Sequence, residues 1–379
     1  MIYLDNAATT YPKPKTVYKN IMDCMTNYCA NPGRSSHTMA IEGAKVIYET
    51  RELVAKLFNF DDPLRVIFTS NATDSLNLAI KGYLKTGDHV ITTSMEHNSV
   101  LRPIHHLEAI GVEHTIINCN DEGLINLNDL QKSIKANTKL IVTTHVSNLT
   151  GTIFPIKEIG AICRKNNICY LVDASQSAGV LDIDMKECNI DMLAAPGHKG
   201  LLGPQGVGIL LLGNGIELQE LKEGGTGSES SKLTQPIFCP DKYESGTPNL
   251  PGIAGLNAGI KYIMSKGVNS IYNHEKKLLD LFINEASKND KIQIYGPKSE
   301  KDRCSVVCLN IIDKDSSEVA YNLDSIYGIA VRPGLHCAPL AHKTIGTKKI
   351  GAVRFSFGPF NKKEEIMYAI KALNEISNK

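Results

Sequence analysis

The sequence predicts an α/β fold with a mostly parallel sheet and a second, smaller α+β domain. Short apolar runs rich in β-branched residues alternate with segments of helical pattern from residue 65 to residue 175. This alternation is typical of strands that are buried on both faces and joined by helices. From about residue 256 the pattern changes to a long helical segment followed by single strands and helices, which indicates a separate α+β unit.

The first elements follow in order along the chain. The N-terminal segment MIYLDNAATTYPKP predicts a short strand and then a turn. Three strand and helix pairs and a further strand come next: RVIFTS (65–70) with DSLNLAIKGYLK (74–85), HVITTS (89–94) with VLRPIHHLEAI (100–110), KLIVTTHVS (139–147) with KEIGAICRKNN (157–167), and CYLVDAS (169–175). A helix between successive strands predicts that these strands run parallel.

The later elements are predicted more sparsely. They are the helical segment beginning with GLNAGIKYIMSKG near residue 256, the strand CSVVCLNII (304–312), a helix near 316–327, the short strand GIAVR (328–332) and a last helix from about 362. We therefore expect a large domain over 15–255 and a small domain over 256–379 together with 1–14. Residues 222–252 are rich in Gly, Ser, Thr and Pro and lack periodicity, which predicts a long functional or disordered loop.

Composition excludes several classes of partner. The 379 residues carry 41 Lys and Arg against 40 Asp and Glu, so neither a nucleic-acid nor a membrane-surface partner is indicated. No signal peptide and no apolar run of about 18 residues is recognised, and we expect a cytoplasmic protein. The ten cysteines are scattered without a CxxC pair or a metal-ligand spacing, so we expect reduced thiols and no metal site.

Polar residues follow several of the apolar runs. Ligands of open α/β sheets collect at the carboxyl ends of the strands, so these positions are candidate site residues. Asn71, Ala72 and Thr73 open a helix after VIFTS and form either a phosphate cradle or a simple N-cap. His97 follows HVITTS, and a structural role remains the alternative for it.

The next two strands end in amides and a carboxylate. Asn148 follows LIVTTHVS, and CYLVDAS delivers Asp173 with Gln176 three residues later. An unpaired buried carboxylate is costly, so Asp173 needs a partner. An N-cap for the following helix is the alternative role.

Lys199 lies among glycines in AAPGHKGLLGPQGVGILLL, next to His198. Glycines allow close approach of the backbone to a ligand. An amine held against apolar surface has a lowered pKa, which favours Schiff-base formation. An exposed loop lysine is the alternative. Together, an amine, an upstream acid, a histidine and a phosphate cradle at one sheet edge fit pyridoxal 5'-phosphate, whose aldehyde needs an amine and whose ring nitrogen needs a carboxylate.

The chain resembles the class V aminotransferase-like, fold-type I pyridoxal-phosphate enzymes, and within them the group II cysteine desulfurases and selenocysteine lyases. The resemblance extends from YLDNAATTYPKP to VRFSFGPFN, nearly the full chain. It implies a large cofactor-binding domain with a mostly parallel seven-stranded sheet, and a smaller α+β C-terminal domain that carries a nucleophile loop.

The resemblance also implies roles for the residues of each motif. GHKGLLGPQGVG places the Schiff base on Lys199 and His198 near the cofactor phosphate. VDASQSAG places Asp173 against the pyridine nitrogen and Gln176 near the ring hydroxyl, where HVSNLTGT also places Asn148.

Further motifs imply the rest of the cofactor site. MEHNS makes His97 the ring-stacking imidazole and an acid or base, and SNATDS makes Thr73, with Ala72, a phosphate ligand. ESGTPN offers Thr247 as a phosphate ligand donated across a dimer interface, which implies a homodimer. Pro196 departs from the family, where many members have a serine that binds phosphate, and this predicts a weaker hold on the cofactor.

Cys337 lies in AVRPGLHCAPLAHKTIGT, in a Gly/Pro-rich turn after a short strand. An imidazolium at the neighbouring His336 would favour the thiolate, although a structural cysteine is the alternative. The stretch RPGLHCAP resembles the nucleophile loop of group II cysteine desulfurases, with Arg332 as a positioning or substrate-contacting residue. Arg354 matches the arginine that binds the substrate α-carboxylate, for which a guanidinium fork is suited.

The resemblance predicts conversion of L-cysteine to L-alanine with a persulfide on Cys337. Lys199 is expected to act as the base at Cα and His97 to assist a protonation, while Asn6, Ala8 and Asn148 join the two arginines at the substrate. The sulfur is expected to pass to an acceptor protein, for iron–sulfur cluster assembly or another thio-transfer path. Three alternatives remain open: a selenocysteine lyase, another class V enzyme such as an aminotransferase or epimerase, and a sulfur carrier without catalysis.

Overall fold

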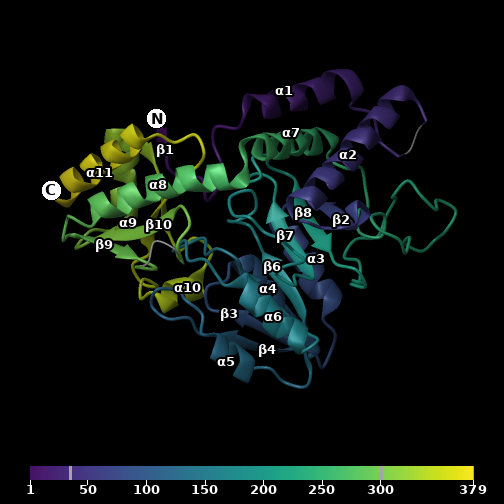
Figure 1. Cartoon of the computed structure of the whole chain (residues 1–379), viewed down its shortest axis with the longest axis horizontal. Coiled ribbons are helices and arrows are strands. Elements are labelled where there is room, and N and C mark those ends of the chain that lie inside the picture. Colours follow the sequence, from purple (N-terminus) through teal and green to yellow (C-terminus); the bar gives the residue numbers. More distant parts are fainter. Residues whose placement is uncertain (34–35, 299–301, 379) are drawn as a thin grey trace.

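The computed structural model describes residues 1–33, 36–298 and 302–378, and it confirms the predicted fold class. A seven-stranded sheet has the order β2-β8-β7-β6-β5-β3-β4 (Figure 1). Its strands are β2 (Val66–Thr69), β3 (His89–Thr93), β4 (Glu113–Ile117), β5 (Thr138–Thr144), β6 (Cys169–Asp173), β7 (Met192–Pro196) and β8 (Gly208–Leu212). All neighbours are parallel except β8, which is antiparallel to β2 and β7. Residues 197–207 join β7 to β8 without an intervening helix.

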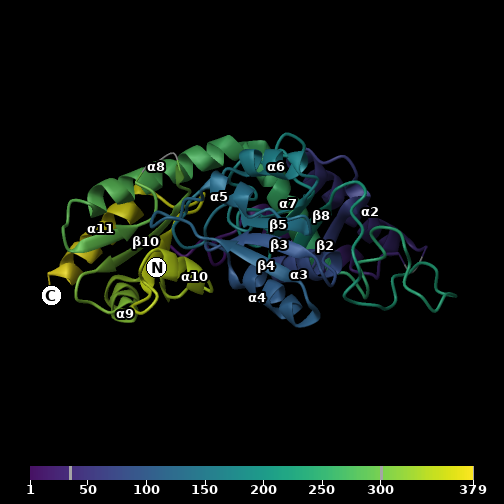
Figure 2. The ribbon, with the colours of Figure 1, turned by 90° about the horizontal axis from the view of Figure 1, so that it is seen from below.

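Helices cover both faces of this sheet. Viewed from below, α3 (Ala72–Tyr83) and α4 (Asn98–Leu107) lie on one face, and α6 (Ile156–Lys165) and α7 (Leu250–Lys266) lie on the other (Figure 2). Further helices are α1 (Lys15–Asp23), α2 (Thr38–Leu57) and α5 (Leu127–Lys132), a π-helical turn over Cys24–Tyr28, and 3-10 turns over Pro63–Arg65 and Glu108–Ile110.

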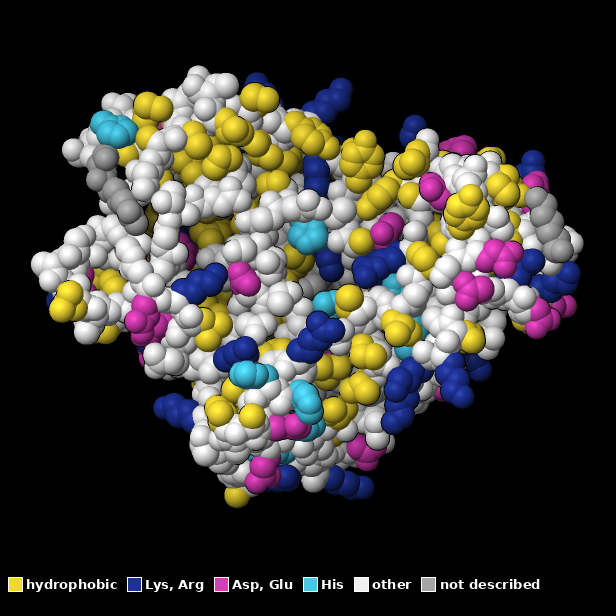
Figure 3. All heavy atoms as spheres, turned by 180° about the vertical axis from the view of Figure 1, so that it is seen from behind, with side chains coloured by type: hydrophobic (Ala, Val, Ile, Leu, Met, Phe, Trp, Pro, Cys, Tyr) yellow, Lys and Arg dark blue, Asp and Glu magenta, His cyan; other side chains and the backbone are white. Residues whose placement is uncertain are grey.

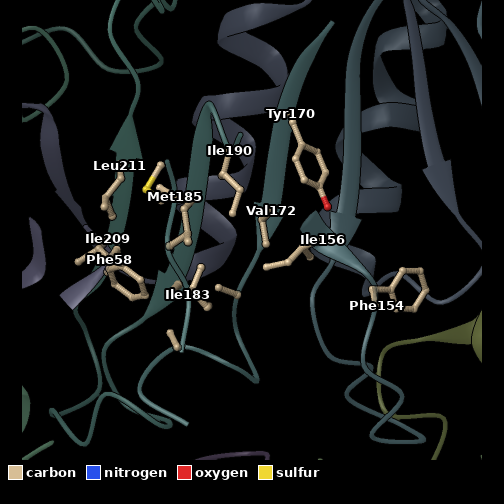
Figure 4. Close-up of a cluster of buried hydrophobic side chains, with 14 of the residues drawn as sticks. Phe58, Phe154, Ile156, Tyr170, Val172, Ile183, Met185, Ile190, Ile209 and Leu211 are labelled. Atoms are coloured by element: carbon tan, nitrogen blue, oxygen red, sulfur yellow. The ribbon is translucent and has the colours of Figure 1, made fainter. Parts of the chain in front are cut away.

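Successive strand residues point to opposite faces, and both faces are apolar. Tyr170 and Val172 of β6 pack into the core beneath α6, with Ile209 and Leu211 of β8 (Figure 4). Their neighbour Leu171 packs into the core beneath α3 and α4. This two-sided burial explains why the strands appear as continuous apolar runs in the sequence.

The later part of the chain builds an antiparallel sheet of order β12-β13-β10-β9. Its strands are β9 (Ile292–Tyr295), β10 (Val306–Ile311), β12 (Arg332–Gly334) and β13 (Ala352–Ser356), and the helices here are α8 (Val268–Ala286), α9 (Ser316–Tyr327), α10 (Pro339–Thr344) and α11 (Lys363–Ser377). β1 (Ile2–Tyr3) pairs with β11 (Ile329–Ala330), so both termini lie in this smaller unit (Figure 1).

The predicted domain division at residue 255 stays a prediction, and α7 runs across that position. Between β8 and α7 the described chain has no helix or strand. No helix among the described residues is long and apolar enough to cross a membrane.

Gly151 allows the loop after β5 to pack closely against the backbone at the start of β10. Gly151 has φ +73°, and a Cβ there would lie 2.6 Å from the carbonyl oxygen of Val306 and 2.7 Å from that of Cys304. Its own carbonyl accepts the N–H of Cys304 at 2.8 Å. The loop that carries Asn148 is thereby held on the smaller sheet.

We expect Gly151→Ala to lower the free energy of unfolding by about 2 to 4 kcal/mol, because left-handed strain of about 1 kcal/mol adds to overpacking of about 1 to 3 kcal/mol. Gly215→Ala is the matched control, since Gly215 has φ +80° but no heavy atom within 4 Å of the added Cβ. Urea unfolding followed by circular dichroism measures both, and equal losses would contradict the packing argument.

Candidate active site

Lys199 follows β7 in a tightly packed turn. Its carbonyl accepts the hydroxyl of Thr10 at 3.0 Å and the N–H of Leu202 at 2.9 Å. A Cβ on Gly200 would lie 2.4 Å from the carbonyl oxygen of Ala178, so only glycine fits there. Burial, and then the charge of Arg354, lower the pKa of the Lys199 amine to about 8. This amine is therefore far closer to its neutral, nucleophilic form than an ordinary lysine.

Asp173 is buried at the carboxyl end of β6. Its Oδ1 accepts the backbone N–H of Ser175 at 2.9 Å and the hydroxyl of Ser175. No hydrogen bond from the described residues reaches Oδ2. Gln176 lies on the following turn and donates through Nε2 to the carbonyl of Ala7 at 3.1 Å.

His97 is a neutral imidazole at the start of α4. Its Nδ1 accepts the backbone N–H of Ser99 at 3.1 Å and is 2.9 Å from the Ser99 hydroxyl. Because Nδ1 accepts, the neutral ring carries its proton on Nε2. Burial lowers the pKa of His97 to about 4, the charge of Asp173 acts against this, and Lys199 acts with it. Because the charges of Asp173 and Lys199 both act on His97, the three residues belong to one site.

The amino end of α3 lies beside this histidine. Asn71 caps the helix, with Oδ1 accepting the N–H of Asp74 at 3.0 Å. The hydroxyl of Thr73 lies 2.8 Å from that of Ser99, which therefore joins Thr73 to His97. Within the described chain the N–H groups of Ala72 and Thr73 have no acceptor, as is usual for a first helical turn.

His198 lies close to the N-terminal segment. Its Nδ1 is 3.0 Å from the hydroxyl of Thr9, and its carbonyl accepts from Thr9, Thr10 and Lys13. Burial, with the charges of Lys199 and Lys13, lowers the pKa of His198 to about 4. Pro196 is the buried last residue of β7 and supplies no hydroxyl.

Thr247 is not brought together with Lys199 within one chain. It is exposed on the loop before α7 and lines a hollow of about 470 Å³ with Ser70 and Arg51. Lys199 lines a different cavity of about 30 Å³, with Gln176 and Asn6.

Arg354 joins three segments of the chain. It is 1% exposed in β13; Nη2 pairs with Asp5 Oδ1 at 2.8 Å, and Nη1 donates to the carbonyl of Asn148 at 3.0 Å. Its buried Nε has no acceptor among the described residues. Asn148 donates through Nδ2 to the carbonyl of His336 at 2.8 Å. Arg332 on β12 is directly opposite Arg354.

Cys337 is exposed on the loop between β12 and α10. His336 and Cys337 have φ +52° and +56°, left-handed conformations that cost about 1 to 3 kcal/mol each and that the surroundings must hold. The carbonyl of Cys337 accepts the N–H of Asn98 at 2.8 Å, and Arg332 Nη2 lies 3.8 Å from Cys337 Sγ. The backbone of Cys337 is thus fixed at the start of α4, next to His97 in the sequence.

The expectation of an imidazolium at His336 is wrong. The ring is buried, with Nε2 3.0 Å from the carbonyl of Arg332 and Nδ1 3.2 Å from Nε2 of His342. Burial lowers the pKa of His336 to about 3, so the ring is neutral at physiological pH. Arg332 contacts Cys337 Sγ in its place.

Asn6 and Ala8 lie on the same N-terminal segment as Asp5. Asn6 donates to the carbonyl of Ser356 at 3.1 Å and to Asn361 Oδ1 at 3.0 Å, and its Oδ1 accepts from Tyr11. The N–H of Ala8 donates to the carbonyl of Asp5 at 3.0 Å. Substrate contacts of Asn6 and Ala8 stay predictions.

Sequence reasoning missed Asp5, Glu96 and Ser99. Glu96 is fully buried, and its Oε1 accepts the hydroxyl of Thr93 at 2.6 Å and the N–H of Thr144 at 3.0 Å. Burial raises its pKa to about 8, and Asp173 acts in the same direction. The available signals were Asp5, two positions after the short strand β1, and Glu96, directly before His97. No group of three or more His, Cys, Asp or Glu side chains in the described part of the chain could hold a metal.

Comparisons with known proteins agree on one family. The Aminotransferase class-V family matches residues 2–368. The chain is 33% identical to a probable cysteine desulfurase of Methanothermobacter thermautotrophicus and 36% identical to one of Pyrococcus abyssi, covering 99% of this chain and 94% of each relative. The apo structure of cysteine desulfurase from Thermococcus onnurineus superposes with a TM-score of 0.94 at 34% identity, covering 100% of this chain and 94% of that one.

Glu96 predicts a pH dependence of stability. The folded carboxyl stays protonated up to about pH 8, whereas an unfolded glutamate ionises near pH 4.3. Between these values the folded state binds the extra proton, so stability falls as pH rises, by up to about 1.4 kcal/mol per pH unit.

We expect Glu96→Gln, which cannot ionise, to show a shallower loss of stability over this range. Denaturant unfolding at several pH values measures the slope for both proteins. Parallel curves would contradict a protonated Glu96.

Proposed function

The chain belongs to the class V aminotransferase family and, within it, to the cysteine desulfurases, and we propose that it uses pyridoxal 5'-phosphate to convert L-cysteine to L-alanine with a persulfide on Cys337. One observation supports this: Arg332 contacts the exposed thiol of Cys337 and is, with Asp173 and Arg354, one of the charged groups that act on the buried amine of Lys199.

The described residues fit the cofactor. The unpartnered Oδ2 of Asp173 suits a protonated ring nitrogen, and the Lys199 amine, with its pKa of about 8, suits an aldehyde. The neutral ring of His97 would lie against the cofactor ring, with Gln176 and Asn148 near its hydroxyl. When bound, pyridoxal phosphate supplies the aldehyde and an electron-withdrawing ring that acidifies the Cα proton.

The phosphate would be held at the start of α3. The free N–H groups of Ala72 and Thr73 and the hydroxyl of Thr73 are suited to an anion. His198 would complete this set with Thr247 of a second copy, since Thr247 lines a different hollow from Lys199 in its own chain. The proposal therefore includes a homodimer, and Pro196 would weaken the phosphate site.

The substrate carboxylate would bind Arg354. Its Nε–H is buried and unpartnered, and Asp5 and the carbonyl of Asn148 hold the guanidinium plane in place. Arg332, Asn148 and the segment with Asn6 and Ala8 complete the surroundings of the substrate.

Protons and sulfur are handled by different groups. The neutral amine of Lys199 takes the proton from Cα, and Nε2–H of His97 gives a proton back. The Cys337 thiolate, next to Arg332, attacks the substrate sulfur; the new S–S bond forms as the substrate C–S bond breaks. L-alanine leaves, and the sulfur passes to an acceptor protein, for iron–sulfur cluster assembly or another thio-transfer path.

We expect Cys337→Ala to lose alanine formation from L-cysteine and to retain cleavage of L-selenocysteine, from which selenium can leave without the thiol. The assay incubates wild type and variant with each substrate, quantifies alanine, and maps the persulfide by peptide mass. Cys308→Ala, a buried thiol on β10, is the control and should keep the persulfide on Cys337.

The other outcomes separate the competing functions. Alanine from L-cysteine without any protein persulfide would favour a different class V reaction. Wild-type protein that binds no cofactor, with Lys199→Ala unchanged, would favour a carrier without catalysis. Either result contradicts the proposal.

We expect Arg354→Lys to raise the KM for L-cysteine by about 10- to 100-fold, because the ammonium cannot keep Asp5, Asn148 and a carboxylate together. Steady-state kinetics with alanine detection measures KM and kcat. An unchanged KM would remove Arg354 from substrate binding.

A further inference from the structure

We propose that the surface around Cys337 docks an acidic sulfur-acceptor protein that presents a cysteine thiol. This acceptor surface consists of Leu335 and Ile350 with Lys343, Lys348 and Lys349. The inference rests on the proposed function, because it requires a persulfide on Cys337, and it adds the docking residues and the charge of the partner.

The charge pattern of this part of the chain is one-sided. Residues 325–363 contain no Asp or Glu and seven Lys or Arg, although the whole chain is nearly neutral. Arg354 is buried at the substrate site, but Lys343, Lys348 and Lys349 are exposed. None of these three lysines pairs with a carboxylate of the described residues. Several exposed lysines elsewhere pair with carboxylates, as Lys135 does with Glu113.

The centre of the acceptor surface is apolar. Leu335 is 44% exposed and Ile350 is 57% exposed, while His336 between Leu335 and Cys337 is buried. Leu335 and Ile350 lie next to Gly334 and Gly351 in the sequence, and these two glycines are in close contact, since a Cβ on Gly351 would lie 3.2 Å from the Cα of Gly334. Dark blue and yellow side chains lie next to one another over the region of α10 (Figure 3). An apolar centre with charged surroundings is the usual anatomy of a protein interface.

Buried hydrogen bonds hold this surface in one shape. The carbonyl of Arg332 can only accept, so His336 Nε2 carries a proton and His336 Nδ1 must accept from His342 Nε2. His342 Nδ1 then accepts the hydroxyl of Thr347 at 2.7 Å. This chain of neutral groups fixes α10 and the turn over 347–350 to the loop that carries Cys337.

Two further contacts anchor the edges. The hydroxyl of Thr344 donates to Ser94 at 2.9 Å, and the hydroxyl of Ser316 donates to the carbonyl of Ile350 at 3.1 Å. Because the lysines stand on a preformed surface, less ordering is needed when an acidic partner binds.

The transfer itself needs no added oxidant or reductant. A thiolate of the acceptor attacks the outer sulfur of the Cys337 persulfide and forms a new S–S bond. The bond to Cys337 Sγ breaks, and Cys337 leaves as a thiolate. A nucleic acid also carries negative charge, but a thiol acceptor and an apolar centre favour a protein.

The experiment loads the holoenzyme with L-cysteine and supplies synthetic peptides with one cysteine flanked by glutamates or by lysines. At about 0.01 M salt, where charges act over about 30 Å, we expect the acidic peptide to accept sulfur about tenfold faster or more. At about 1 M salt, where charges act over about 3 Å, the two rates should converge. Equal rates at low salt would overturn the proposal.

The Lys348→Glu/Lys349→Glu double variant should reverse the preference between the peptides. Alanine formation with dithiothreitol as the neutral acceptor should stay within about twofold of wild type, because these lysines lie outside the substrate site. Lys139→Glu/Lys165→Glu is the matched control, because the change in net charge is equal. Both residues are exposed; Lys139 is the second residue of β5, and Lys165 ends α6 shortly before β6, so both belong to the opposite edge of the sheet.

The possible outcomes distinguish a failure of the acceptor surface from a failure of the proposed function. If the control variant reverses the preference as strongly, net charge alone is responsible and the acceptor surface is wrong. Polyuridylate, which has no thiol, tests the nucleic-acid alternative. If it blocks sulfur transfer to the acidic peptide in wild type but not in the Lys348→Glu/Lys349→Glu variant, the acceptor surface binds a nucleic acid and the proposal of a protein partner is wrong. If wild type forms no persulfide on Cys337, the proposed function fails before docking is tested.

Discussion

The buried guanidinium of Arg354 is the interaction on which the arrangement of the site depends. A charge taken out of water must be paired, and here the partners come from segments far apart in the sequence: Asp5 and the loop that carries Asn148. Asn148 in turn holds the backbone of His336. The N-terminal segment, the large sheet and the Cys337 loop therefore converge on one side chain, and an unpartnered Nε–H remains for an anion.

Burial also decides which groups of the site are charged. It lowers the pKa of His97, His198 and His336, so these imidazoles are neutral, and it raises the pKa of Glu96, so this carboxyl keeps its proton near neutral pH. With Glu96 protonated, Asp173 does not face a second negative charge at close range. The lowered pKa of Lys199 has the same origin.

Cys337 is exposed on its loop, whereas Asp173 and Arg354 of the site are buried. Its polar histidine is buried and its leucine and cysteine are exposed, the reverse of the usual distribution. Left-handed backbone at two successive residues is held by hydrogen bonds from Asn148 and Asn98. A fixed, exposed thiol beside Arg332 is suited to passing sulfur to another molecule.

The sequence by itself determined the α/β class and most of the strands near the site, because apolar runs and helix caps such as Asn71 are local signals. It also indicated Lys199, Asp173 and Cys337 through their motifs. It did not indicate β4, α1, α2 or the antiparallel β8, whose patterns are weak or depend on the neighbouring strand. The pairing of Asp5 with Arg354 and the neutrality of His336 were decided by tertiary structure alone. Both depend on burial and on groups brought together across the chain, which no local pattern of residues records.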